Sequence, residues 1–174
     1  MPDIYDSEKR SEIMSRISGK ETKPEIIVRK FLFSNGFRYR KNDKKLPGKP
    51  DIVLSKYKTV IFIHGCFWHG HSCKSGRLPE TRKQFWEEKI GTNKERDQRN
   101  RAILTEAGWK VLIVWQCDLK NKALREKRLI ELKDQIIELT HKPIPVNEKS
   151  AKQVLSRRAD ANIPSGYNTL SNEW

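Results

Sequence analysis

The stretch TVIFIHGCFWHGHSC, residues 59–73, decides the fold because it joins an apolar run to a dense group of polar and aromatic side chains. The run TVIFI (59–63) is apolar on both faces of a strand, which predicts a central position in a sheet. The next ten residues hold three of the chain's four histidines and two of its three cysteines, with a phenylalanine and a tryptophan between them. Glycine-bearing segments after a central strand are common sites of chemistry, so we expect the functional site here.

The segments on either side predict a small α/β domain. A capping box at Thr22 and Glu25 starts a helix that has Pro24 in its first turn and stops at Gly36. Other helices are predicted over 7–18, from Pro79 with an interruption at Gly91, over 93–107 and over 122–140. Strands are predicted over 37–42, 51–54, 58–63 and 109–117. Because helices and strands alternate, we expect an α/β fold in which helices flank a mixed sheet.

Charge and composition indicate the class of partner. Lys and Arg number 36 against 22 Asp and Glu, giving a net charge of +14 and a pI near 9.8. Such an excess favours nucleic acid over a surface that is only solubilising. No apolar run approaches the ~20 residues of a membrane helix, and the N-terminus lacks a secretory signal. We therefore expect a cytoplasmic protein with one domain over 1–141 and a tail of uncertain order over 142–174.

The cysteines and histidines predict a metal site. An odd number of cysteines in a reducing cytosol favours metal over disulfides. Cys66 follows the strand at 58–63 and Cys117 ends the strand at 109–117, so parallel neighbouring strands would bring both to one edge with Cys73. Three thiolates and one histidine would make a closed structural zinc site, although spacing alone does not choose among His64, His69 and His71.

Several acidic residues are candidates for catalysis. Asp51 opens one strand and His64 ends the next, an arrangement that can hold Mg²⁺ with backbone carbonyls and water. A histidine outside the zinc site could move the proton. Glu25, Glu95 and Asp97 are further acidic candidates. Structural roles are the alternative: Glu25 could simply cap its helix, Asp97 could be a solvated surface charge, and Asp51 could be a turn residue.

Five segments resemble very short patch repair endonucleases, in the same order and at closely matching spacing over roughly residues 7–120. They are MSRISGKETKPE (14–25), PGKPD (47–51), VIFIHGCFWHGHSC (60–73), FWEEKIGTNKERD (85–97) and GWKVLIVWQC (108–117). The resemblance implies a bacterial, nucleoid-associated enzyme with a restriction-endonuclease-like core. Such enzymes nick the T-containing strand at T:G mismatches, which arise when 5-methylcytosine deaminates. They use Mg²⁺ at the active site and a separate structural zinc.

The resemblance also implies residue roles, carried over by position. The zinc ligands would be Cys66, His71, Cys73 and Cys117. Asp51 and the backbone carbonyl of Ile63 would bind Mg²⁺, with His69 as general acid–base. Glu25, His64 and Asp97 would orient water and neighbouring groups, and Phe67, Trp68 and Trp86 would intercalate in DNA. Two departures stand out: the best-known relatives have Thr at position 63, and the lysine of the wider nuclease pattern is missing near His64.

Two aromatic residues are bracketed by the implied zinc ligands. Inserting a ring tests stacking, which is weaker at a mismatch, and zinc beside Phe67 and Trp68 would order them in advance. Trp86 could instead pack in the core against Phe85. Met14 and Ile17, in an N-terminal DNA-gripping segment over 1–20, could contact the minor groove or equally face the core.

Rival functions follow from the same residues. They are a restriction-type or structure-specific nuclease of the same core and a non-catalytic zinc-stabilised DNA-binding module. A catalytic zinc hydrolase is disfavoured, because a closed site has no open ligand position. The expected partner is double-stranded DNA with a T:G mismatch, bound by a monomer, with recruitment of a mismatch-repair protein left open.

Overall fold

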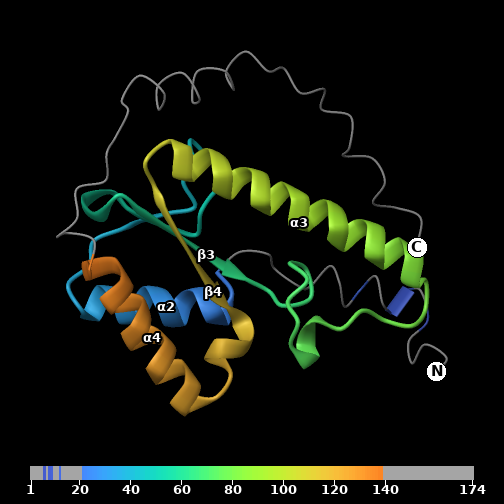
Figure 1. Ribbon diagram of the computed structural model, residues 1–174. Helices are drawn as coiled ribbons and strands as arrows, with labels where there is room; N and C mark the ends of the chain where they lie inside the picture. Colours follow the sequence, from blue (N-terminus) through green and yellow to red (C-terminus); the bar gives the residue numbers. More distant parts are fainter. Residues whose placement is uncertain (1–5, 7, 10–11, 13–20, 139–174) are drawn as a thin grey trace.

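The structure is a computed structural model that describes residues 6, 8, 9, 12 and 21–138. Within these residues the chain forms a four-stranded sheet and three α-helices (Figure 1). The helices are α2 (Lys23–Ser34), α3 (Lys83–Glu106) and α4 (Lys122–Ile137), and the strands are β1 (Arg40–Lys41), β2 (Ile52–Leu54), β3 (Thr59–His64) and β4 (Lys110–Trp115). Met14, Ile17 and the tail at 142–174 lie outside the described residues, and the helix over 7–18 lies largely outside them.

The sheet is mixed, with the strand order β1-β2-β3-β4. β1 and β2 pair antiparallel, as do β2 and β3, whereas β3 and β4 are parallel. Ile61 pairs with Leu112 in that parallel register, and His64 pairs with Trp115. These two strands therefore lie side by side, which is the condition for Cys66 and Cys117 to meet, and their carboxyl ends lie at one edge of the sheet.

Helices cover both faces of the sheet (Figure 1). On one face α2 and α4 bury Leu32 and Leu132 against Ile61 and Leu112. On the other face α3 buries Leu104 against Val60 and Val53, with Phe62 and Val111 packed at the side. Because successive β3 side chains point to opposite faces, even-numbered residues of β3 face α3 and odd-numbered ones face α2 and α4.

Three sequence expectations need correction. Gly91 does not interrupt the helix, since α3 runs continuously through it and buries Ile90, Asn100 and Leu104. Glycine costs a helix only about 1 kcal/mol relative to alanine, which this burial outweighs. The helix begins at Lys83 rather than Pro79.

The third correction concerns the strand predicted over 37–42, which the structure reduces to Arg40–Lys41. Phe37 is buried instead, and its N–H donates to the Leu32 carbonyl at 3.0 Å as α2 ends. The predicted stop is confirmed, because Gly36 adopts a left-handed φ of +83° just beyond α2. None of the described helices has the length and apolar character needed to cross a membrane.

Candidate active site and metal centre

Two clusters of side chains with metal-binding atoms lie at the carboxyl ends of β3 and β4. One contains Cys66, His71, Cys73 and Cys117, and the other contains His64, His69 and Asp97. Within each cluster the candidate ligand atoms all lie within 4.8 Å of one another. The parallel pairing of β3 and β4 explains the location, because both strands lead into loops at the same edge.

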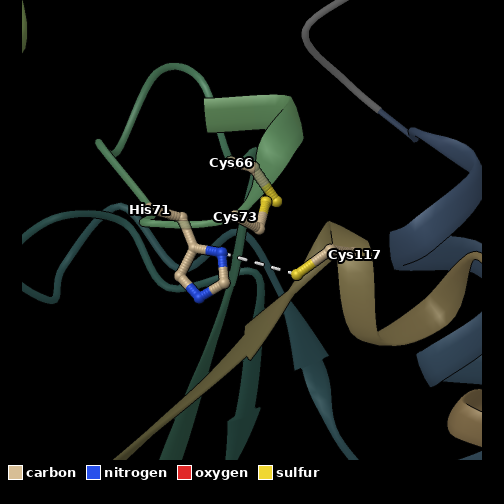
Figure 2. Close-up of side chains that lie close together, drawn as sticks. All are labelled: Cys66, His71, Cys73 and Cys117. Atoms are coloured by element: carbon tan, nitrogen blue, oxygen red, sulfur yellow. Dashed lines mark hydrogen bonds between the residues drawn. The ribbon is translucent and has the colours of Figure 1, made fainter. Parts of the chain in front are cut away.

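The Cys/His cluster has the donor set of a structural zinc site (Figure 2). Cys66 and Cys73 come from the loop after β3, and Cys117 comes from the turn after β4. The Cys117 sulfur lies 3.5 Å from His71 Nδ1. In a tetrahedral zinc site with Zn–S bonds near 2.3 Å, ligand atoms lie roughly 3.5–3.8 Å apart, so the residues fit the ion. Of the three histidines that spacing left open, His71 is the one in this cluster.

The thiols of this cluster also differ in acidity. A hydrogen bond with His71 lowers the pKa of Cys73 to about 6. Burial raises the pKa values of Cys66 and Cys117 instead. Without a cation the cluster therefore does not ionise all three thiols at neutral pH, whereas a bound dication would favour three thiolates.

Close backbone contacts shape the loop that carries these ligands. The His71 N–H donates to the Cys66 carbonyl at 2.9 Å, which closes the turn around Phe67 and Trp68. A β-carbon at Gly76 would lie 1.9 Å from the His71 carbonyl oxygen, so only glycine fits there. Gly70 has a φ of +60° and packs against Lys94 of α3, which fixes the loop on that helix.

Asp51 lies at the start of β2, beside the backbone of β3. Its carboxylate accepts a hydrogen bond from the Ile63 N–H at 2.7 Å. Burial raises the pKa of Asp51 to about 6; the Ile63 N–H opposes this shift and the charge of Glu25 adds to it. The preceding turn has Gly48 at φ +73°, packed against Asn100 of α3. Asp51 is thus held in position by two elements and is costly to ionise without a cation.

Two stacked imidazoles lie next to this carboxylate in the cleft. The rings of His64 and His69 stack with centroids 3.7 Å apart and planes 10° apart. His69 Nδ1 lies 2.5 Å from the Asp97 carboxylate of α3. Because an ionised carboxylate only accepts, this contact assigns the proton to Nδ1 and leaves Nε2 able to exchange one. Burial lowers the pKa of His64 to about 4, so this ring is neutral at physiological pH.

Glu25 both caps its helix and contributes to the cleft. Its carboxylate accepts from the Thr22 N–H at 3.3 Å and from the Thr22 hydroxyl at 2.7 Å. It also pairs with the buried Arg29 at 3.4 Å. Glu95, by contrast, is exposed and does not line the cleft.

One cleft of about 1200 Å³ brings the candidate active-site residues together. Its lining includes Glu25, Asp51, Ile63, His64, His69 and Asp97, and Trp68 lies at its side. Basic residues also line it: Lys49, Lys94, Arg96, Arg99 and Arg101. The net charge predicts a basic protein that binds nucleic acid, but it does not single out these five cations. Four of them lie within eight residues of α3, a signal that was available in the sequence.

The residues expected to intercalate form one surface cluster. Phe67 makes edge contacts with Trp68 and with Trp86, each with ring centroids 5.1 Å apart. Phe85 joins the cluster through Trp86, also at 5.1 Å. Trp68 is 43 % exposed and Phe85 is 40 % exposed, so Phe85 does not draw Trp86 into the core. Phe85 was expected only as a core partner of Trp86, and its place on this surface was not predicted.

A basic cleft that holds a partly buried carboxylate and paired imidazoles fits an α/β enzyme acting on a polyanion such as nucleic acid. Comparisons specify the family. The family described as DNA mismatch endonuclease Vsr matches residues 2–75. The type II nicking enzyme V.NmeAIP of Neisseria meningitidis is 60 % identical over 136 residues, which are 78 % of this chain and 97 % of that protein. The chain therefore belongs to the very short patch repair endonuclease family.

Two further relatives agree with this assignment. The type II nicking enzyme V.XorIIP of Xanthomonas oryzae is 46 % identical over 134 residues, covering 77 % of this chain and 98 % of that protein. The DNA mismatch endonuclease Vsr of Escherichia coli is 46 % identical over 122 residues, covering 70 % of this chain and 78 % of that protein. The predicted resemblance is thus confirmed at the level of the family.

Proposed function

We propose that the protein is a DNA mismatch endonuclease that nicks the T-containing strand at T:G mismatches left by deamination of 5-methylcytosine. One observation carries the proposal: Asp51 and the His64–His69–Asp97 group share a basic cleft whose side includes the exposed Trp68. The relatives named as mismatch endonuclease and nicking enzymes support both the substrate and the cutting of one strand.

The cleft suits Mg²⁺. Asp51 is partly buried, has a raised pKa and lies in the same cleft as a second carboxylate, that of Glu25. Hard dications prefer such oxygen ligands, and a bound cation would favour the ionised form of Asp51. Asp51 and the carbonyl of Ile63 would hold the ion. Bound there, Mg²⁺ would neutralise charge on the scissile phosphate and make water more acidic.

The imidazoles and their carboxylate would transfer the proton. Asp97 accepts a hydrogen bond from the Nδ1–H of His69, so that Nε2 would exchange a proton with water or with the departing oxygen. His64 is neutral and stacks on His69, which keeps that ring in plane without adding a positive charge beside it. Glu25 would orient the attacking water near Asp51.

The Cys/His cluster would bind one structural Zn²⁺. The chain between Cys66 and His71 carries Phe67 and Trp68, so both ends of this aromatic segment would be fixed by one ion. The conformational-entropy cost of ordering the two rings would then fall on folding rather than on DNA binding.

The aromatic cluster would detect the mismatch by stacking. Phe67, Trp68 and Trp86 would enter the base stack, each contributing about 1–3 kcal/mol of stacking free energy. Unstacking costs a few kcal/mol and less where pairing is imperfect, so insertion would favour T:G over a matched pair. Phe85 is adjacent and would extend the same surface.

Further parts of the proposal concern the whole chain. We propose a restriction-endonuclease-like core, one endonuclease domain over 1–141, and a monomer that acts on bacterial nucleoid DNA. The segment 1–20 would grip DNA, with Met14 and Ile17 in the minor groove. Recruitment of a mismatch-repair protein is a further proposal without a residue assigned to it.

A nicking assay tests the function. Duplexes that differ only in T:G against C:G at one position, and then in the flanking bases, are incubated with the protein and Mg²⁺. We expect a nick in the T strand of T:G alone, lost in His69→Ala by about 100-fold or more, and unchanged in the exposed control Glu95→Gln. Equal cutting of both duplexes would indicate a restriction-type or structure-specific nuclease. Binding without any nick would indicate a DNA-binding module.

A further inference from the structure

Trp115, the last residue of β4, lies between the two clusters of metal-binding and catalytic side chains. Its indole stacks on the His71 ring, with centroids 4.3 Å apart and planes 23° apart. On its other side it meets the His64 ring edge-on, with centroids 5.2 Å apart. Neither the mechanism nor the metal site described above uses this side chain, although it also lines the cleft.

The contacts continue beyond Trp115 in both directions. His71 belongs to the Cys/His cluster, where its Nδ1 lies 3.5 Å from the Cys117 sulfur. His64 stacks on His69, which is bonded to Asp97. A ring held by one hydrogen bond can still rotate about its side-chain torsions, so the orientation of His69 also depends on its stacking against His64. His64 in turn has Trp115 and Phe62 as its remaining ring neighbours among the described residues.

Backbone pairing makes this arrangement stiff. His64 and Trp115 are direct partners in the parallel ladder of β3 and β4, so their side chains leave the same face of the sheet side by side. The Trp115 N–H donates to the Asp118 carboxylate at 3.3 Å, which fixes the turn that carries Cys117. Indole is large and rigid, with only two side-chain torsions, so it transmits a displacement of one neighbour to the other.

We infer that Trp115 is a positioning residue that couples the Cys/His metal cluster to the imidazoles of the cleft. A metal bound by His71 would fix the orientation of its ring. The stacked indole would then fix the orientation of His64, and His64 that of His69. The kinetic part of this inference rests on the proposed nicking activity, because it assigns His69 to proton transfer.

Substitutions at position 115 test the positioning role. In Trp115→Leu we expect kcat for nicking to fall by about 10- to 100-fold, as displacements near 1 Å at a reacting group do. The Kd for T:G duplex should change by less than about three-fold, because the aromatic surface that stacks on DNA is not altered. Trp115→Phe keeps a flat ring and should retain kcat within about five-fold. The matched control, Trp109→Leu, removes an indole from the residue just before the other end of β4 and should leave kcat unchanged.

A double-mutant cycle tests the coupling. His71→Cys retains a zinc ligand but removes the ring that stacks on Trp115, and zinc content per chain verifies that the ion is kept. If the indole carries the coupling, the double variant with Trp115→Leu should be about as slow as Trp115→Leu alone. Independent, multiplicative losses in kcat would overturn the inference, as would equal losses in Trp115→Leu and Trp109→Leu.

A second readout does not need nicking. In NMR spectra of histidine ring protons, His71→Cys should shift the His64 and His69 signals when residue 115 is Trp, less when it is Phe, and least when it is Leu. Equal shifts in all backgrounds would overturn the coupling even if the enzyme is active. Absence of nicking by the wild-type chain would reject the proposed function, and the NMR comparison would still decide the role of Trp115. If Trp115→Leu does not fold, the NMR comparison is made with Trp115→Phe.

Discussion

Replacing Asp51 by asparagine should abolish nicking while making the magnesium-free protein more stable at neutral pH. Partial burial of the carboxyl group raises its pKa from 3.8 to about 6. Such a change corresponds to about 3 kcal/mol of free energy between its two protonation states. Because Asp51 is only partly buried and water screens it, we expect about 1–2 kcal/mol to be recovered in Asp51→Asn at pH 8. The asparagine oxygen can still accept from the Ile63 N–H, so no buried donor loses its partner.

The pH dependence gives this prediction its sign. The folded state binds the Asp51 proton more tightly than the unfolded state, since the folded pKa of about 6 lies above 3.8. The wild type therefore loses stability from this group as pH rises from about 4 to about 6, and stays at the lower level above that range. Asp51→Asn has no such loss, so its advantage should be largest at pH 7–8 and shrink toward zero near pH 4.

Urea unfolding at pH 4.5 and pH 8 measures the effect. Magnesium is left out, and chelators are avoided so that metal at the Cys/His cluster is retained. The control Asp134→Asn removes an exposed carboxylate of α4 and should change stability by less than about 0.5 kcal/mol at both values. A variant that is less stable than the wild type at pH 8, or that gains equally at both pH values, would refute the account of Asp51 as a carboxylate strained by burial.

Other substitutions test the remaining parts of the site. Asp97→Asn removes the carboxylate that fixes His69 with its proton on Nδ1, so nicking should slow by about 100-fold or more while DNA affinity stays unchanged. Single-turnover kinetics measures this rate, and a milder loss would remove Asp97 from the mechanism. Cys117→Ser should lose the zinc and more than about 2 kcal/mol of unfolding free energy, measured by metal analysis and urea titration, and full stability without zinc would contradict a structural ion. Trp68→Ala should weaken binding of T:G duplex by about 1–3 kcal/mol in fluorescence anisotropy but hardly affect matched duplex, whereas equal losses on both would argue against mismatch probing.

The sequence was most informative where hydrophobic pattern alone determines structure. The apolar runs at 59–63 and 109–117 correctly predicted β3 and β4, and their parallel pairing made the meeting of Cys66 and Cys117 foreseeable. Residue spacing could not choose which histidine joins the three cysteines, because that choice depends on the path of the loop. The hydrogen bond from His71 to Cys66 and the tight packing at Gly76 define that path, and both are tertiary features.

Local signals failed where tertiary packing competed with them. Gly91 suggested a break, yet burial of Ile90 and Leu104 at either side keeps α3 continuous. Phe37 had strand propensity, but its burial beside Leu32 removes it from the sheet. The position of Trp115 against His64 could have been predicted, since both end neighbouring parallel strands. Its stacking on His71 could not, because it again depends on the loop.

The continuity of α3 has a consequence for how this protein can change in length. Trp86 and Asp97 lie eleven positions apart on one helix, which at 1.5 Å per residue separates them by about 16 Å along its axis. Inserting a single residue between them would rotate Asp97 by about 100° around that axis and carry it away from His69. Insertions should therefore be excluded from this interval and tolerated in the segment just before Lys83, so that helical geometry fixes the separation between the rings proposed to probe DNA and the proposed site of cutting.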